Sequence, residues 1–207
     1  MKRIEDNVVI EVIDYNQRAV LFLGSLLKKY FLLRGFYVNA HSSTVYASKR
    51  PYSVYRIEVS ESRQALQIDN TDILIVLSNA LFAEPDSKHI AHGRVVLCCG
   101  FVNYYKPGQQ CIEVPTGFFL QFKNHEMAIQ IGIASALLAL LNQPLSLLMH
   151  IAPKKEFLDK ILIFNFIFAS IYEWIWQNYY ESGRVFPFTF ALTSPEEELA
   201  EELSLIR

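Results

Sequence analysis

The stretch from residue 8 to residue 60 constrains the fold of this chain more than any other part of the sequence. Residues 8–13 form an apolar run that predicts a strand, and residues 17–33 carry apolar side chains at a three-to-four spacing that predicts a helix. Residues 36–40 follow the helix almost directly and predict a second strand. A helix that crosses back to a parallel strand forms a βαβ unit, so we expect an α/β protein.

Strands and helices continue to alternate along the chain. Strands are predicted at residues 54–60, 73–77, 94–99 and 111–114, and helices at residues 80–92 and 124–142. The polar residues 41–51 predict a displayed loop. We therefore expect a mostly parallel sheet flanked by helices, in a Rossmann-like three-layer arrangement.

The character of the sequence changes near residue 153. Residues 1–152 are predicted to form one α/β domain, and residues 153–207 a helical extension that packs on this domain or on a partner. The extension consists of a helix that is apolar on nearly every side and a short acidic tail helix with Ser194 as its N-cap. Five aromatic side chains are candidates for core or subunit contact, with a hydrophobic ligand pocket as the alternative: Phe164, Phe168, Tyr172, Trp174 and Trp176.

Composition and charge argue against several classes of protein. The 207 residues are 52% hydrophobic, which is ample for a large core, and the net charge of −2 argues against binding to nucleic acid. The most apolar runs are shorter than the roughly 18 residues of a membrane-spanning helix, so no membrane span is expected. Acidic residues interrupt the N-terminal apolar region, which argues against a secretory signal and favours a cytoplasmic location.

The turn between the first strand and its helix lacks the sequence of a nucleotide site. No glycine lies there to let the backbone approach a pyrophosphate, so we expect a structural turn with Asp14 or Asn16 near the helix N-cap. A zinc-protease helix starting at His125 would need a second histidine at position 129, where Ile129 stands. His89 and His92 lack a third ligand at an evident spacing, so no metal site is expected.

The sequence also shows no recognisable group for nucleophilic catalysis. Cys98 and Cys99 lie in an apolar strand and are predicted to be core residues, and no Gly-x-Ser-x-Gly elbow presents a serine. The loop that contains Tyr46, Lys49 and Arg50 could contact a phosphate or a partner carboxylate, or form an ordinary charged rim beside an interface. The residues alone therefore identify no active site.

The order of the elements and several short motifs resemble a known family. Gln17 stands where the family has the glutamine of a G-x-G-G-Q-G turn, and Tyr46 and Arg50 fall in the following tyrosine-bearing loop. YRIEVS at residues 55–60 and TDILIVLSNA at residues 71–80 are similar to the later strands. The chain resembles the γ subunit, or γ domain, of the 2-oxoacid:ferredoxin oxidoreductases, which act on pyruvate, 2-oxoglutarate or branched oxoacids such as ketoisovalerate. It resembles a degenerate member of this family, because the four glycines of the turn are replaced.

The resemblance implies a component without catalysis of its own, which packs against α- and β-type subunits. Thiamine diphosphate, the iron–sulfur cluster and coenzyme A are expected on the complex, with no cofactor bound by this chain. Gln17, Tyr46 and Arg50 are then the candidates for any remaining cofactor contact. Two alternatives stay open: an α/β interaction or dimerisation module without an enzymatic role, and a free-standing enzyme or small-molecule binder.

Overall fold

The computed structural model describes residues 7–47, 50–61, 70–83, 95–99, 109–115, 117–153, 155, 157 and 161–181. Its first elements are β1 (Asn7–Asp14), α1 (Gln17–Leu33), β2 (Tyr37–Val45), β3 (Tyr52–Ser60), β4 (Ile73–Val76) and the 3-10 helix η1 (Asn79–Ala83). They are followed by β5 (Val95–Cys99), β6 (Gln110–Val114), the 3-10 helix η2 (Gly117–Gln121), α3 (His125–Leu140), α4 (Leu145–Ile151), α5 (Ile161–Ile175) and the π-helix η4 (Trp176–Glu181). The remainder of the predicted helix at 80–92 and the predicted acidic tail helix lie outside the described residues.

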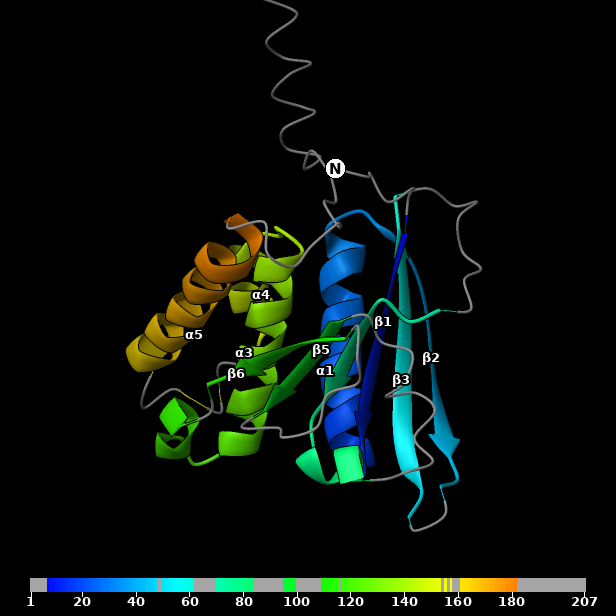
Figure 1. Ribbon diagram of the computed structural model, residues 1–207. Coiled ribbons are helices and arrows are strands. Elements are labelled where there is room, and N and C mark those ends of the chain that lie inside the picture. The colour runs from blue at the N-terminus through cyan, green and yellow to red at the C-terminus, as the bar shows by residue number, and fades with distance from the viewer. Residues whose placement is uncertain are drawn as a thin grey trace, which may run out of the picture.

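The strands form one six-stranded sheet in the order β2-β3-β1-β4-β5-β6 (Figure 1). β1 pairs in parallel with β4, β4 with β5, and β5 with β6, whereas β3 is antiparallel to both of its neighbours, β1 and β2. Of the described strands, only β3 therefore runs against the others. The predicted α/β class with a mostly parallel sheet is confirmed.

The β2–β3 hairpin differs from the sequence-based expectation. β2 does not pair with β1, because β3 inserts between them in antiparallel register. β2 also continues to Val45, so the first half of the loop predicted at residues 41–51 is strand. The error has a physical cause: β2 is an edge strand with largely exposed side chains, and its polarity resembles that of a loop.

Helix α1 packs on one face of the sheet, and its ends follow the predicted signals. Asn16 is the N-cap, and Gly35 follows the helix with a φ of 87°, a left-handed conformation that glycine adopts without strain. Gly24 faces the sheet, where a Cβ atom would overlap the ring of Tyr55 on β3. The missing side chain therefore lets the helix approach the strand closely.

Helix α3 lies beside α1 on the same face of the sheet, and α5 packs on its outer side (Figure 1). Because α3 lies between the sheet and α5, the side chains from Ile131 to Leu141 are buried. Gly132 contacts the ring of Phe119 of η2, where a Cβ atom would overlap it, as expected for the small residues of this helix. α1, α3, α4 and α5 share one core cluster with the sheet.

The opposite face of the sheet is apolar over some strands and charged over others. On the side of β4 and β5, a second apolar cluster includes Val76, Val96 and Leu81 of η1. On the side of β1 and β3, the same face carries an ionic network. Arg56 donates to Glu11 at 2.9 Å and to Glu58 at 3.1 Å, and all three side chains are largely buried. In the part of the chain that is described, no helix is long and apolar enough to cross a membrane.

Candidate functional site

The carboxyl ends of β1, β4 and β5 surround a cleft of about 420 Å³. The connection after β1 leads to β2 on one side, and β4 lies on the other, so the cleft is at a topological switch point. Such points are the usual ligand sites of open α/β sheets. The side chains that line it come from the ends of these strands and from α1 and α3: Asp14, Asn16, Ala19, Leu77, Ser78, Asn79, Cys99, Glu126, Ile129 and Gln130.

The first turn of α1 closes one wall of the cleft. The Asn16 side-chain oxygen accepts the backbone N–H groups of Arg18 at 3.1 Å and Ala19 at 3.4 Å. These donors are the ones that would bind a phosphate at a helix N-terminus. Because Asn16 occupies them, the turn acts as a helix cap, as the sequence predicts.

Asp14 is a buried carboxylate at the end of β1. Its side chain accepts the N–H of Tyr15 at 2.6 Å. Burial raises the pKa of Asp14 above its ordinary value, and the charge of Glu126 acts in the same direction, whereas the backbone N–H groups of Asn16 and Tyr15 and the charge of Arg50 oppose the shift. The raised pKa means that burial in the cleft destabilises the ionised form of Asp14.

Helix α3 contributes the opposite wall. Asn124 caps it by accepting the N–H of Met127 at 3.3 Å, and Glu126 lies in the first turn, where the helix dipole favours a negative charge. Gln130, one turn further on, is only 7% exposed and lines the cleft. Among the described residues, the lining includes two carboxylates and no lysine or arginine, which disfavours phosphorylated or carboxylate ligands.

Cys99 is the thiol of the cleft. Burial raises its pKa to about 12, with a smaller contribution from the charge of Asp14. At neutral pH the group is therefore a thiol, which is a poor nucleophile. The sequence predicted a core residue here, and Cys99 instead packs partly buried against the edge of the core and lines the cleft.

The three cofactor-contact candidates lie outside the cleft lining. The guanidinium of Arg50 stacks over the ring of Tyr15 at 4.9 Å, close to the first turn. Gln17 begins α1 with an exposed side chain, and Tyr46, which is 86% exposed, follows the end of β2. The structure thus brings Arg50 to the turn, but it does not bring the three together around the cleft. Lys49 of the same loop lies outside the described residues.

The aromatic residues of the C-terminal helix occupy two different environments. Phe164 and Phe168 are fully buried in the core of the chain, with their ring centroids 4.3 Å apart, so they are core and not subunit contacts. Tyr172 and Trp176 are partly buried against the same core, and Trp176 donates its indole N–H to Asn142 at 3.3 Å. Of the five candidates, only Trp174 belongs to the exposed face.

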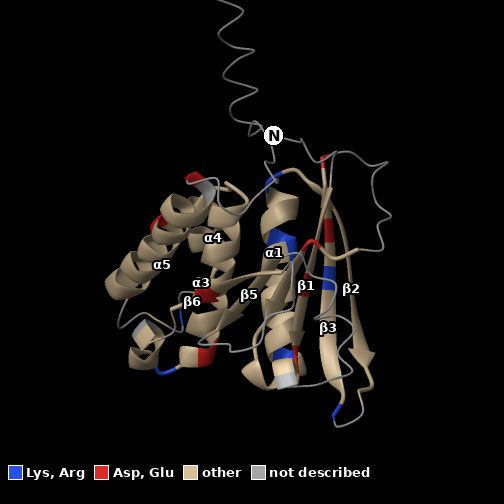
Figure 2. Ribbon diagram, viewed as in Figure 1, with Lys and Arg blue, Asp and Glu red and all other residues tan. Residues whose placement is uncertain are grey.

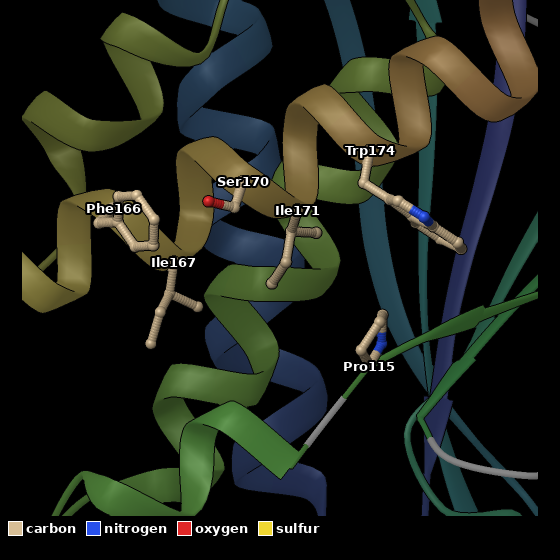
Figure 3. A pocket seen from close by; sticks show the side chains of 6 residues that line it. All are labelled: Pro115, Phe166, Ile167, Ser170, Ile171 and Trp174. Carbon is tan, nitrogen blue, oxygen red and sulfur yellow. The ribbon is translucent and has the colours of Figure 1, made fainter.

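That exposed face carries large apolar side chains. Phe166 is 72% exposed and Leu162 80%, and Ile163 and Trp174 are also exposed. Figure 3 shows Phe166 and Trp174 on α5 at either end of a groove of about 380 Å³, with Pro115 below them. Figure 2 shows the positions of charged residues on the ribbons of α1 and β3, whereas α5 lacks charged residues along most of its length. We call Leu162, Ile163, Phe166 and Trp174 the apolar face of α5.

The described residues contain no group of three or more histidine, cysteine, aspartate or glutamate side chains that could hold a metal ion. His125 lies exposed in the first turn of α3 next to Glu126. His89 and His92 lie outside the described residues. Sequence reasoning missed Asn79 and Gln130 as cleft residues, because only the chain fold brings η1 and α3 to the end of β1.

No protein-family model matches the chain, and no curated protein sequence matches it. Several solved structures, however, are similar to it. A 2-oxoglutarate:ferredoxin oxidoreductase from Magnetococcus marinus, with 2-oxoglutarate, coenzyme A and succinyl-CoA bound, is similar with a TM-score of 0.67 and 15% identity, over 94% of this chain and 34% of that chain. The present chain thus spans about a third of that protein.

Two further structures are closer to this chain in size. A pyruvate oxidoreductase subunit from Thermotoga maritima has a TM-score of 0.59 at 16% identity, over 82% of this chain and 97% of that one. The γ subunit of a keto/oxoacid ferredoxin oxidoreductase from Geobacter sulfurreducens has a TM-score of 0.53 at 15% identity, over 82% and 96%. This chain therefore has the α/β fold of these components of 2-oxoacid:ferredoxin oxidoreductases, as the resemblance in its sequence predicted.

Proposed function

We propose that this chain is a non-catalytic γ-type component of a cytoplasmic 2-oxoacid:ferredoxin oxidoreductase complex. The observation that supports the proposal most is the extent of the fold match, which covers 97% of the Thermotoga subunit and 96% of the Geobacter γ subunit. The common fold is thus that of a whole subunit and not of an isolated motif. The complex would convert a 2-oxoacid such as pyruvate to an acyl-CoA by oxidative decarboxylation.

The electrostatics of the cleft support placing the chemistry on partner subunits. A 2-oxoacid, thiamine diphosphate and coenzyme A are all anionic, and they would meet Asp14 and Glu126 in a cleft whose described lining residues include no lysine or arginine. The first-turn N–H groups of α1 are occupied by Asn16. In our proposal the α- and β-type subunits hold these cofactors and the iron–sulfur cluster.

The apolar face of α5 supports a contact with another protein. An exposed group of large apolar side chains around a groove costs free energy in water, and such patches commonly mark interfaces. Phe166 and Trp174 are the aromatic anchors that an interface of this kind uses. We propose that this face contacts one of the partner subunits.

Affinity purification of the tagged chain from its native cells tests the proposal. We expect thiamine-dependent α- and β-type subunits to co-purify and the complex to reduce ferredoxin with a 2-oxoacid. Recovery of the chain without any thiamine-dependent partner would refute it.

The Asp14→Asn variant tests the absence of catalysis, since a reconstituted complex should keep its turnover. A hundredfold loss of turnover would assign chemistry to this chain.

A dimerisation module is the second candidate, and the same apolar face supports it. Sedimentation of the isolated chain separates the two. A stable homodimer that is unaffected by α- and β-type subunits favours the module, whereas a chain that aggregates alone and is rescued by co-expression favours the complex.

A further inference from the structure

The parallel strands β5 and β6 each carry a cysteine on the same face of the sheet. Their register pairs Val96 with Cys111 and Cys98 with Glu113. Residues two apart on a strand project from the same face, so the side chains of Cys98 and Cys111 meet diagonally across the two strands. Their sulfur atoms are 3.2 Å apart, close enough for one thiol to donate to the other.

The two thiols differ in exposure. Cys98 is fully buried in the apolar cluster on this face, and its sulfur also lies 3.7 Å from the carbonyl oxygen of Ile112. Cys111 is partly exposed on β6, the last described strand of the sheet. An oxidant from solvent therefore reaches Cys111 first, and Cys98 lies behind it.

The hydrogen bond between the thiols also makes their reactivities different. Either thiol could be the donor; when the more buried Cys98 donates, a thiolate on Cys111 is stabilised and its pKa is lowered, whereas the same bond, together with burial, raises the pKa of Cys98. The thiolate is the reactive form of cysteine. Cys111 is thus the attacking group, and Cys98 is positioned to react second.

We propose that Cys98 and Cys111 are a peroxide-reactive dithiol that closes to a disulfide between β5 and β6. The Cys111 thiolate attacks one oxygen of hydrogen peroxide, the O–O bond breaks, and the hydroxide released takes up a proton to form water. The Cys98 sulfur then attacks the sulfenic sulfur of Cys111, the S–O bond breaks, and the departing hydroxide leaves as a second water with the Cys98 proton. The thiols lose two electrons and the peroxide gains them.

Closure requires only a small movement. A disulfide bond is about 2.05 Å long, so the sulfurs must approach by about 1 Å. β6 pairs with β5 alone among the described strands, so it can shift toward Cys98 without breaking a second ladder. Cys99 points to the other face and lines the cleft, which makes it the matched control. This inference is independent of the proposed function.

The test treats the reduced full-length chain with stoichiometric hydrogen peroxide. We expect an intact mass lower by two hydrogen atoms, and peptide mapping without reductant should find Cys98 joined to Cys111. The Cys99→Ser variant should behave like the wild type, and Cys111→Ser should form no disulfide. In Cys98→Ser, a 1,3-diketone that labels sulfenic acids should mark Cys111.

Three results would overturn the inference. These are a disulfide that includes Cys99, stepwise addition of oxygen to Cys111 without a disulfide, and no reaction at either thiol. The wild-type mapping decides the matter by itself, so a variant that fails to fold does not leave the question open. Circular dichroism before treatment identifies such a variant.

Discussion

The two halves of the sheet bury different kinds of side chain. The half formed by β1, β2 and β3 with α1 buries charge: Arg56 lies between Glu11 and Glu58 in a network that leaves few of its polar atoms exposed. The half formed by β4, β5 and β6 with α3 and α5 buries apolar side chains in short strands and in a helix that is buried from Gln130 to its end.

The difference extends to the outer surfaces of the two halves. α1 presents charged residues such as Arg18 and Lys29 to solvent, whereas α5 presents Leu162 and Phe166. The exposed side of α5 is thus more apolar than that of α1, and we propose that it contacts another protein. From this comparison we expect that contact with other proteins is concentrated in the half that contains β4, β5, β6 and α5, the parallel half. Four predictions test this expectation, in decreasing order of their expected effect on stability.

Replacing Arg56 by methionine should have the largest effect. It leaves the carboxylates of Glu11 and Glu58 buried without their cation, and breaking a buried ion pair in this way costs about 3–5 kcal/mol of the free energy of unfolding. Urea denaturation measures the loss. The triple variant with Glu11→Gln and Glu58→Gln should recover most of it. If the single substitution is neutral, the antiparallel half does not depend on its charges.

Adding a methyl group to either packing glycine should have the next largest effect. In Gly24→Ala the new Cβ overlaps Tyr55, and in Gly132→Ala it overlaps Phe119, so each should cost about 1–3 kcal/mol. Tyr55 is held in a central strand and Phe119 in a short 3-10 helix, so Gly24→Ala should be the more costly. Thermal unfolding compares the two. The reverse order would mean that the parallel half is the more rigid.

Tyr30→Phe tests the link between the halves. The Tyr30 hydroxyl on α1 donates to the carbonyl oxygen of Pro144, just before α4, at 2.7 Å. Loss of this bond should cost about 1 kcal/mol. Tyr46→Phe is the control, because that side chain is 86% exposed and should not change the melting temperature. Equal melting temperatures for the Tyr30 and Tyr46 variants would show that the bond contributes nothing.

Phe166→Ser should have the smallest effect on stability and a clear effect on association. An exposed side chain of α5 contributes within about 0.5 kcal/mol to folding, but its loss removes an anchor of the apolar face. Co-purification with partner subunits should fall relative to Leu33→Ser, a matched change at the exposed end of α1. Equal loss in the two variants would remove the distinction between the halves.

Much of the secondary structure could be predicted from local sequence. The helix predicted at residues 17–33 has the observed bounds, and the strand predicted at 73–77 is within one residue of β4. The capping role of Asn16 and the stop at Gly35 also follow from local chemistry. β2 was cut short because an exposed edge strand and a polar loop have similar compositions.

The candidate site was much less predictable. Gln17, Tyr46 and Arg50 came from motif positions, but the cleft is formed by Asp14, Gln130 and their neighbours. Gln130 does not stand out within the helix pattern, and only the placement of α3 beside the end of β1 brings its side chain into the lining of the cleft. The pairing of Cys98 with Cys111 has the same origin in strand register.

The sequence by itself determined the βαβ opening, the α/β class and the glycine-free turn, because periodicity and capping act over a few residues. Only the tertiary structure decided that β3 inserts beside β1, that Phe164 and Phe168 belong to the core, and that Phe166 does not. An α5 that is apolar on every side could turn any of its faces inward. The choice was made by contacts of α5 with α3 and with Phe119 of η2, which precede α5 in the chain and meet it only in the folded structure.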